Sequence, residues 1–214
     1  MKSKKLSAIF PISLILISFV LAIYFYFKIP IDIIATHWGA DGQVNGYSSK
    51  FFGLFFMPIL SVFMLILFLV LPKIDPYKKN FSEFKNYFQN FINIIFIFFF
   101  YTYCLILFWN LNYRFNMIQF LSPAFALLFY YAGVLMSHAK RNWFVGIRTP
   151  WTMSSPKVWD KTHSLGGKLF KLVSLIILLS LPFPQFALFF ILIPIFFVTA
   201  FIFVYSYLEY RKLK

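Results

Sequence analysis

The sequence predicts an all-α membrane protein, a polytopic bundle of six membrane-spanning helices with both termini in the cytoplasm. Hydrophobic residues make up 61% of the 214 residues and charged residues 12%, whereas soluble domains are about half apolar and about a quarter charged. The apolar residues form uninterrupted runs, as membrane helices do, rather than the alternation of a barrel strand. With 1 cysteine, Cys104, the chain is also not a disulfide-rich scaffold or a cysteine-based metal protein.

Six segments are apolar enough to cross a bilayer core, which needs about 20 helical residues. The predicted spans are 6–27, 51–71, 90–109, 118–137, 169–183 and 186–208. The first follows three lysines, as a signal peptide would, but its apolar run is longer than that of a signal peptide. No small-x-small cleavage site follows it either, so we expect a retained helix.

The fifth span is the shortest, and Lys171 lies near its start. A lysine within one turn of a helix end can extend its ammonium group to the headgroups, so this span is compatible with membrane crossing. Pro182 and Pro184 then predict a tight turn before the last helix.

The distribution of charge predicts the orientation of the helices. If the N-terminus is inside, the inner segments 1–5, 72–89, 138–171 and 209–214 hold 17 of the 20 basic residues. This is the positive-inside pattern of membrane proteins. The basic excess therefore indicates contact with an anionic inner leaflet of the cell membrane, and we expect no direct nucleic-acid partner.

The predicted extracellular segment, 29–50, is longer than a helix hairpin needs and is rich in turn-forming residues. Three glycines, an aspartate and an asparagine lie within residues 39–46, which is typical of turns with positive φ. His37, Trp38 and Tyr47 flank these turns. The segment is either a folded recognition surface or an interfacial loop with its aromatic rings at headgroup level. A metal site at His37 and the two aspartates of the segment would have one imidazole and no known ligand spacing, so we predict none.

The long cytoplasmic segment, 138–168, contains a second helix signal. Ser155 followed by Pro156 is a favoured N-cap and first position, and predicts a short helix over about 156–164. In that helix Trp159 and His163 lie one turn apart on one face. The glycine pair that follows predicts a break before the fifth span.

Upstream of that helix, Arg148 lies between Trp143 and Trp151, with a flexible glycine at 146 and a proline at 150. Such a mixture of basic and aromatic residues fits a juxtamembrane segment lying in the lipid interface. It fits a protein-docking or ligand site equally well.

Catalytic motifs are lacking. The sequence contains no HExxH, GxSxG, GxxxxGK[ST] or GxGxxG pattern, and no acidic residue lies inside a predicted span. Asp160 and His163 are three residues apart and have no nucleophile beside them. We therefore predict that the protein is not an enzyme and needs no cofactor.

Three stretches, in chain order, resemble motifs of the SdpI-like family of bacterial membrane proteins, the immunity family for a sporulation-delaying toxin. The first is an outer motif, Thr36-His37-Trp38 with Gly42 and Asn45-Gly46-Tyr47-Ser48-Ser49-Lys50. The second is a first inner loop, Leu71-Pro72-Lys73-Ile74-Asp75-Pro76 with Asn80. The third is a highly specific second inner loop, Asn142-Trp143-Phe144-Val145-Gly146-Ile147-Arg148-Thr149-Pro150-Trp151-Thr152 with Trp159 and Lys161-Thr162-His163. Asn45 departs from the family pattern, in which an Asp is expected before the Gly-Tyr pair.

The resemblance implies an immunity protein that protects the cell from a secreted, membrane-active peptide toxin. It also implies that the protein senses the toxin and holds a small winged-helix repressor at the membrane. The residues it assigns to the extracellular recognition loop are Thr36, His37, Trp38, Gly42, Asn45, Gly46, Tyr47 and Lys50. Those it assigns to the cytoplasmic signature loop are Asn142, Gly146, Arg148, Thr149, Pro150, Trp151, Trp159 and His163.

The chain is expected to form a single membrane domain, 1–214, with an N-terminal half, 1–117, and an SdpI-like C-terminal half, 118–214. Three spans in each half, with a long loop after the first helix of each, is also the layout of an inverted repeat. A transporter or flippase for a small molecule or peptide is therefore the alternative function. An intramembrane enzyme is a weaker one, because no nucleophile–base pair is present.

Overall fold

The structure, a computed structural model, describes residues 7–213. Its elements in chain order are α1 (Ile9–Lys28), β1 (Ile33–Trp38), β2 (Val44–Ser49), α2 (Lys50–Ile74), α3 (Lys78–Glu83), α4 (Lys85–Asn110), α5 (Met117–His138), α6 (Pro150–Ser154), α7 (Pro156–Leu178), a 3₁₀ turn (Pro184–Phe186) and α8 (Ala187–Arg211). The three lysines before the first predicted span, the first residue of that span and the last residue of the chain lie outside the described residues.

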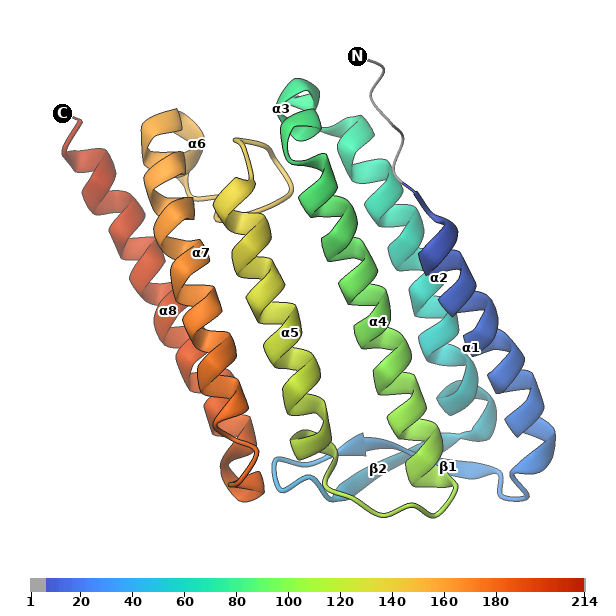
Figure 1. Ribbon diagram of the computed structural model, residues 1–214. Coiled ribbons are helices and arrows are strands. Elements are labelled where there is room, and N and C mark those ends of the chain that lie inside the picture. Colours follow the sequence, from blue (N-terminus) through green and yellow to red (C-terminus); the bar gives the residue numbers. More distant parts are fainter. Residues whose placement is uncertain (1–6, 214) are drawn as a thin grey trace.

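The long helices lie side by side in two groups (Figure 1). Helices α1, α2 and α4 form one group and α5, α7 and α8 the other, with α4 packed against α5 where the groups meet. Helix α1 begins and α8 ends at the end of the bundle that carries α3, α6 and the loop 139–149, which we call the basic end. The strands cross the opposite end, which we call the hairpin end.

Among residues 7–213, five helical segments are long and apolar enough to cross a membrane: α1, α2, α4, α5 and Pro184–Arg211, which contains α8. The predicted fifth span, 169–183, is not confirmed, so the six predicted spans are reduced to five candidates among residues 7–213. Its first residues form the C-terminal part of α7, which ends at Leu178, and the N-terminal part of the same helix carries several charged residues. The helix as a whole is therefore amphipathic, although it packs along both α5 and α8.

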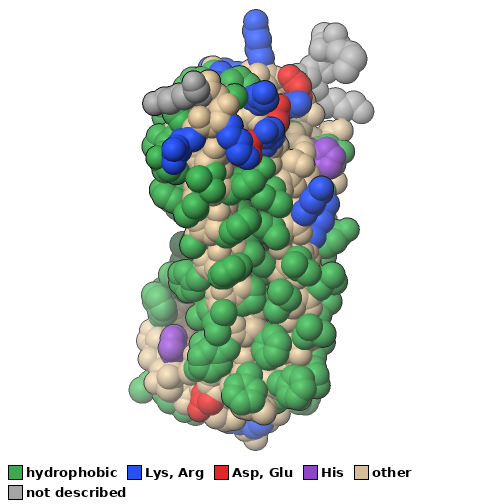
Figure 2. Space-filling model, turned by 90° about the vertical axis from the view of Figure 1, so that its left-hand side faces the viewer, with side chains coloured by type: hydrophobic (Ala, Val, Ile, Leu, Met, Phe, Trp, Pro, Cys, Tyr) green, Lys and Arg blue, Asp and Glu red, His purple; other side chains and the backbone are tan. Residues whose placement is uncertain are grey.

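The outer surface of the bundle is apolar along its length. Within the most apolar stretch of each of the five segments only 22–28% of the residues are buried, so most of their hydrophobic side chains face outward. Figure 2 shows hydrophobic side chains covering the middle of the molecule and most of the visible Lys and Arg side chains at the basic end. Lipid solvates such a belt, which in water would be a very large exposed patch.

The glycine pair expected to break the helix after residue 164 lies inside α7 instead. Ser155 caps α7 as predicted, its hydroxyl accepting from the N–H of Val158 at 3.4 Å, but the helix continues to Leu178. A Cβ at Gly133 of α5 would lie 2.6 Å from the carbonyl oxygen of Gly167, and one at Gly167 would overlap the Ser137 hydroxyl. The prediction was wrong because these glycines serve a close approach of two helices, α5 and α7.

The expected outer loop is a β-hairpin, which corrects the all-α prediction locally. Strands β1 and β2 pair antiparallel with Ile33 opposite Ser49, and the register shifts between Ala35 and Trp38. The turn closes by a hydrogen bond from the Gly39 N–H to the Gln43 carbonyl at 2.8 Å. The β-branched and aromatic residues on either side of the turn favour strands, but the glycines obscure the alternation that would have predicted them.

Candidate functional site

The hairpin is fixed to the ends of two helices by asparagine side chains. The Asn110 Oδ1 at the end of α4 accepts from the Ala35 N–H at 2.8 Å, and its Nδ2 donates to the Ala35 carbonyl at 3.0 Å. At the start of α5, the Asn116 Nδ2 donates to the Asp41 carbonyl at 2.8 Å. Gly42 has φ +75° and lies so close to Asn116 that any Cβ would overlap that side chain. The tip of the hairpin therefore has a fixed position over the joint between the two helix groups.

Lys50, at the junction of β2 and α2, also holds the hairpin in place. Its Nζ donates to the Ile29 carbonyl at 3.1 Å, lies 3.6 Å from the Asp32 carboxylate and lies 5.0 Å from the centre of the Tyr26 ring. Thr36 contacts α2, where its methyl group lies 2.9 Å from the position of a Cβ at Gly53. These two predicted residues therefore face the protein.

The outward face of the hairpin presents His37, Asn45 and Tyr47. All three side chains are exposed, Tyr47 to 60%, and the His37 Nδ1 is hydrogen-bonded to the Asn45 Oδ1 across the strands. A Cβ at Gly46 would lie 2.9 Å from the His37 Cβ, so glycine is needed below the imidazole. Trp38 differs because it is half-buried.

Trp38 belongs to a stack that sequence reasoning missed. Its ring packs against the Trp109 ring edge to face, with the ring centres 5.7 Å apart. The Trp109 ring also contacts Arg114, whose guanidinium lies 3.8 Å from the ring centre. Trp109, Arg114 and the two anchoring asparagines lie outside 29–50. The sequence signal that could have identified these residues is the cluster of hydrogen-bonding side chains at 109–116, between two apolar runs.

At the basic end, Asn142 organises the signature loop. This buried side chain donates from Nδ2 to the carbonyls of Lys140 at 2.8 Å and Val145 at 2.9 Å. Its Oδ1 accepts from the N–H groups of Phe144 at 2.9 Å and Val145 at 2.6 Å. The amide thus closes a turn with all of its polar atoms paired, which a buried asparagine requires.

Trp159 and His163 form the buried centre of the loop, one turn apart on α7 as predicted. Their rings stack at 3.8 Å, and the Trp159 Nε1 donates to the Ala139 carbonyl at 2.8 Å. The His163 Nε2 accepts from the Ile147 N–H at 2.9 Å, so the proton of the neutral ring is on Nδ1, 2.8 Å from the Trp159 carbonyl. Burial lowers the pKa of His163 to about 4, because the charged ring would be desolvated.

Gly146 is required by this histidine. It has φ +105°, and a Cβ there would overlap the His163 Nε2. Both the backbone conformation and the close approach exclude other residues. Gly146 thereby allows the neighbouring N–H to reach the imidazole.

The second part of the loop is fixed to α8. Thr149 and Thr152 form a reciprocal capping box at the start of α6, with Pro150 in the first turn. The Thr149 hydroxyl also lies 3.0 Å from the Ser206 hydroxyl of α8. The Trp151 ring packs against Tyr207 of the same helix, with the ring centres 5.0 Å apart. The loop therefore connects α5, α7 and α8.

The two inner motifs contact each other, which sequence spacing could not predict. The buried Asp75 accepts from the N–H of Tyr77 at 2.6 Å and from the N–H of Trp143 at 2.9 Å. The Asn80 Nδ2 donates to the Arg141 carbonyl at 2.7 Å. A carboxylate and an amide of the first inner loop thus hold the signature loop in place.

Arg148 is exposed and its guanidinium donates to the Trp143 carbonyl. Among residues 7–213 no carboxylate forms an ion pair with it. A polar pocket of about 350 Å³ lies at the same end of the bundle between α3, α4, α5 and α7, lined by residues that include Glu83, Lys140 and Asp160. No group of three or more metal-ligating side chains occurs in the described part of the chain.

Two family models match the chain. Residues 138–207 match the SdpI/YfhL protein family, which confirms the SdpI-like resemblance for the segment that begins with the signature loop. Residues 13–62 match a domain of unknown function, DUF1648, and this segment contains the whole hairpin. No curated protein and no solved structure matched the chain.

Proposed function

We propose that this protein is an immunity protein of the bacterial cell membrane that binds a secreted, membrane-active peptide toxin and works without catalysis. The observation that carries the proposal is the pair of preorganised surfaces, the hairpin at one end and the signature loop at the other. The SdpI/YfhL match over 138–207 supports the class, and the apolar helices fit its membrane location.

In this proposal the basic end faces the cytoplasm. Most of the Lys and Arg side chains lie at that end, and such residues stay inside during membrane insertion. The hairpin then faces outward, where a secreted peptide arrives. Its anchors on α4 and α5 reduce the entropy that binding would cost, which favours affinity.

The proposed contact surface for the toxin is the exposed face with His37, Asn45 and Tyr47. It offers an aromatic ring with a hydroxyl, an imidazole and an amide, side chains suited to peptide recognition. Trp38 supports this surface from below through Trp109.

The signature loop is the proposed docking surface for a cytoplasmic repressor. Trp143 is 51% exposed and lies beside the unpaired charge of Arg148. Exposed tryptophan and arginine are the residues that contribute most at protein interfaces.

The test is survival of bacteria that express the protein and are challenged with the toxin. We expect the double change His37→Ala and Tyr47→Ala to abolish protection at an unchanged amount of protein in the membrane. Gln43→Ala, which changes another exposed side chain of the turn, is the matched control and should protect fully. Full protection by the double variant would show that the toxin is met elsewhere, and loss of protection by the control would show a general defect of the hairpin.

A transporter or flippase is the second candidate, favoured by the two groups of three long helices. Such a protein would move its ligand between the two groups. Uptake or efflux of a labelled toxin peptide by proteoliposomes distinguishes the candidates, because an immunity protein that only binds retains the peptide stoichiometrically and moves none.

A further inference from the structure

A second pocket at the basic end has chemistry unlike that of the polar pocket. It has a volume of about 310 Å³ and lies between the two helix groups, with walls from α2, α4, α5, α7 and the loop segment 144–147. All of its lining side chains are apolar, among them Phe88, Ala132, Met136 and Phe144. A wall without a hydrogen-bonding side chain selects hydrocarbon, because any polar group brought there loses its hydration.

The size of the pocket restricts the occupant further. Pockets for drug-sized ligands cover about 300–1,000 Å³, so this one is at the lower limit. A helix of a peptide toxin, about 10 Å wide with its side chains, is too large for it. One extended acyl chain is narrow enough, and lipid surrounds the exposed apolar surface of the same helices.

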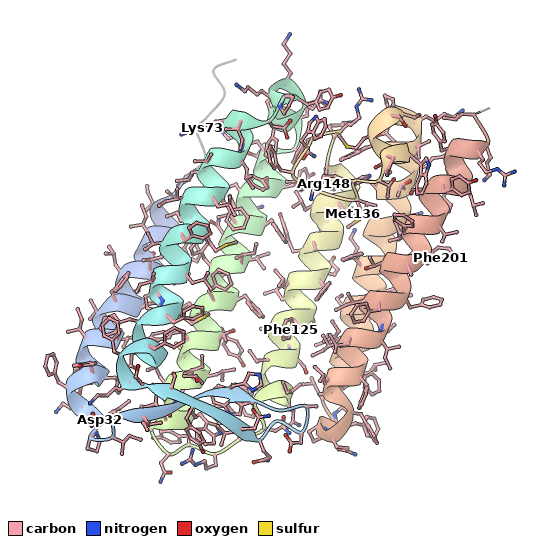
Figure 3. The ribbon with its side chains drawn as sticks, turned by 180° about the vertical axis from the view of Figure 1, so that it is seen from behind. Asp32, Lys73, Phe125, Met136, Arg148 and Phe201 are labelled. Atoms are coloured by element: carbon pink, nitrogen blue, oxygen red, sulfur yellow. The ribbon has the colours of Figure 1, made fainter. Side chains whose placement is uncertain are left out.

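A positive charge lies close to the wall of the pocket, because Arg148 directly follows Ile147, which lines it. The Arg148 guanidinium is bonded to the carbonyl of Trp143, the residue next to Phe144 of the pocket wall. Figure 3 shows Arg148 close to Met136, at the basic end of the space between α5 and the pair α2 and α4. One of the five N–H donors of the guanidinium is used in this bond, and the others have no partner among residues 7–213.

We propose that this pocket holds an acyl chain of an anionic phospholipid whose phosphate group is bound by Arg148. A guanidinium binds phosphate through two parallel hydrogen bonds, and the cytoplasmic leaflet that this end would face is rich in anionic lipid. The bond to Trp143 fixes the guanidinium on the loop whose residues 144–147 form part of the pocket wall. The site is independent of any toxin.

The experiment is native mass spectrometry of the protein extracted from vesicles of equal amounts of phosphatidylglycerol and phosphatidylcholine with identical acyl chains. Both headgroups carry a phosphate, but the choline of phosphatidylcholine adds a positive charge that the Arg148 guanidinium repels. We therefore expect the wild type to retain about tenfold more of the anionic lipid. Arg148→Gln should reduce the ratio to about 1. Arg211→Gln, a change of another exposed arginine at the same end, should leave the tenfold ratio.

The pocket itself is tested with Ala132→Phe, which places a large side chain in it. The matched control is Ala124→Phe, which fills a different apolar recess between α4 and α5. We expect Ala132→Phe to lose retention of both lipids and Ala124→Phe to retain them, with thermal unfolding measured for each variant. Arg148→Gln provides the independent test if Ala132→Phe does not fold.

The proposal is overturned by equal retention of both lipids in the wild type, or by equal losses in Arg148→Gln and Arg211→Gln, which would indicate a general basic field. Displacement of phosphatidylglycerol by inorganic phosphate, together with unchanged retention in Ala132→Phe, would show a phosphate site without a chain pocket. No toxin is present in these measurements, so they do not depend on the proposed immunity function.

Discussion

Acidification should destabilise the protein through His163. The imidazole is 2% exposed, and its Nε2 accepts from the Ile147 N–H, which protonation would forbid. Its pKa is about 4 in the folded protein, against the ordinary value of 6.5 for histidine. Between these values the unfolded chain binds a proton that the folded protein does not, so stability is fully present above pH 6.5 and is lost as the pH falls toward 4.

The magnitude follows from the two pKa values. One pKa unit corresponds to about 1.4 kcal/mol, so the contribution of His163 to the free energy of unfolding falls by about 2 kcal/mol from pH 7 to pH 5 and by about 3 kcal/mol from pH 7 to pH 4. The assay is denaturant or thermal unfolding in a mild detergent, followed by tryptophan fluorescence between pH 7 and pH 4.

The comparison that isolates this residue uses His163→Gln, which lacks a titrating ring. The unfolding free energy of this variant should be lower than that of the wild type at pH 7. On acidification it should fall by less, because the part of the decrease that His163 causes is missing. His138→Gln, which changes a histidine stacked on Tyr87 at 3.7 Å, should keep the wild-type decrease. If the wild type and His163→Gln lose the same stability between pH 7 and pH 4, the histidine is not held as a buried neutral acceptor and the reasoning is refuted.

Three further predictions concern the hairpin, the signature loop and the topology. Asn110→Ala should leave the Ala35 backbone groups unpaired at a cost of about 1–3 kcal/mol, measured as faster amide hydrogen exchange in β1, and unchanged exchange there would contradict the anchoring role. Arg148→Lys should strongly impair function at the signature loop, measured as recruitment of the repressor to the membrane, because an ammonium lacks the planar fork. Lys157→Gln should recruit it normally, and the reverse result would indicate a purely electrostatic membrane contact. A membrane-impermeant thiol reagent applied to intact cells should label Ala40→Cys but not Ser154→Cys, and labelling at Ser154 would invert the proposed orientation.

The sequence predicted those features that depend on local pattern. Hydropathy located the five apolar helices, and the spacing of Trp159 and His163 placed both rings on one face of α7, where they stack. The capping preference of Ser155 was also confirmed. These predictions succeeded because each feature depends on residues within one or two helical turns.

The features that could not be predicted depend on residues far apart in the chain. Gly167 is a helix breaker by propensity, yet it lies within a helix because α5 approaches it closely. Asp75 accepts from the N–H of Trp143, 68 positions away, and nothing in the local sequence of either residue indicates that bond. The sequence analysis placed Asp75 in a motif but assigned it no contact and no role.

Helix α5 has attachments at both of its ends, and this arrangement connects two distant parts of the molecule. At the hairpin end its N-cap residue, Asn116, binds the Asp41 carbonyl. At the basic end Ala139, directly after the helix, accepts from the Trp159 indole. A helix of 22 residues is about 33 Å long, so this one element is long enough to cross a bilayer core. One helix therefore connects the tip of the hairpin directly to the loop around Trp159, at opposite ends of the molecule.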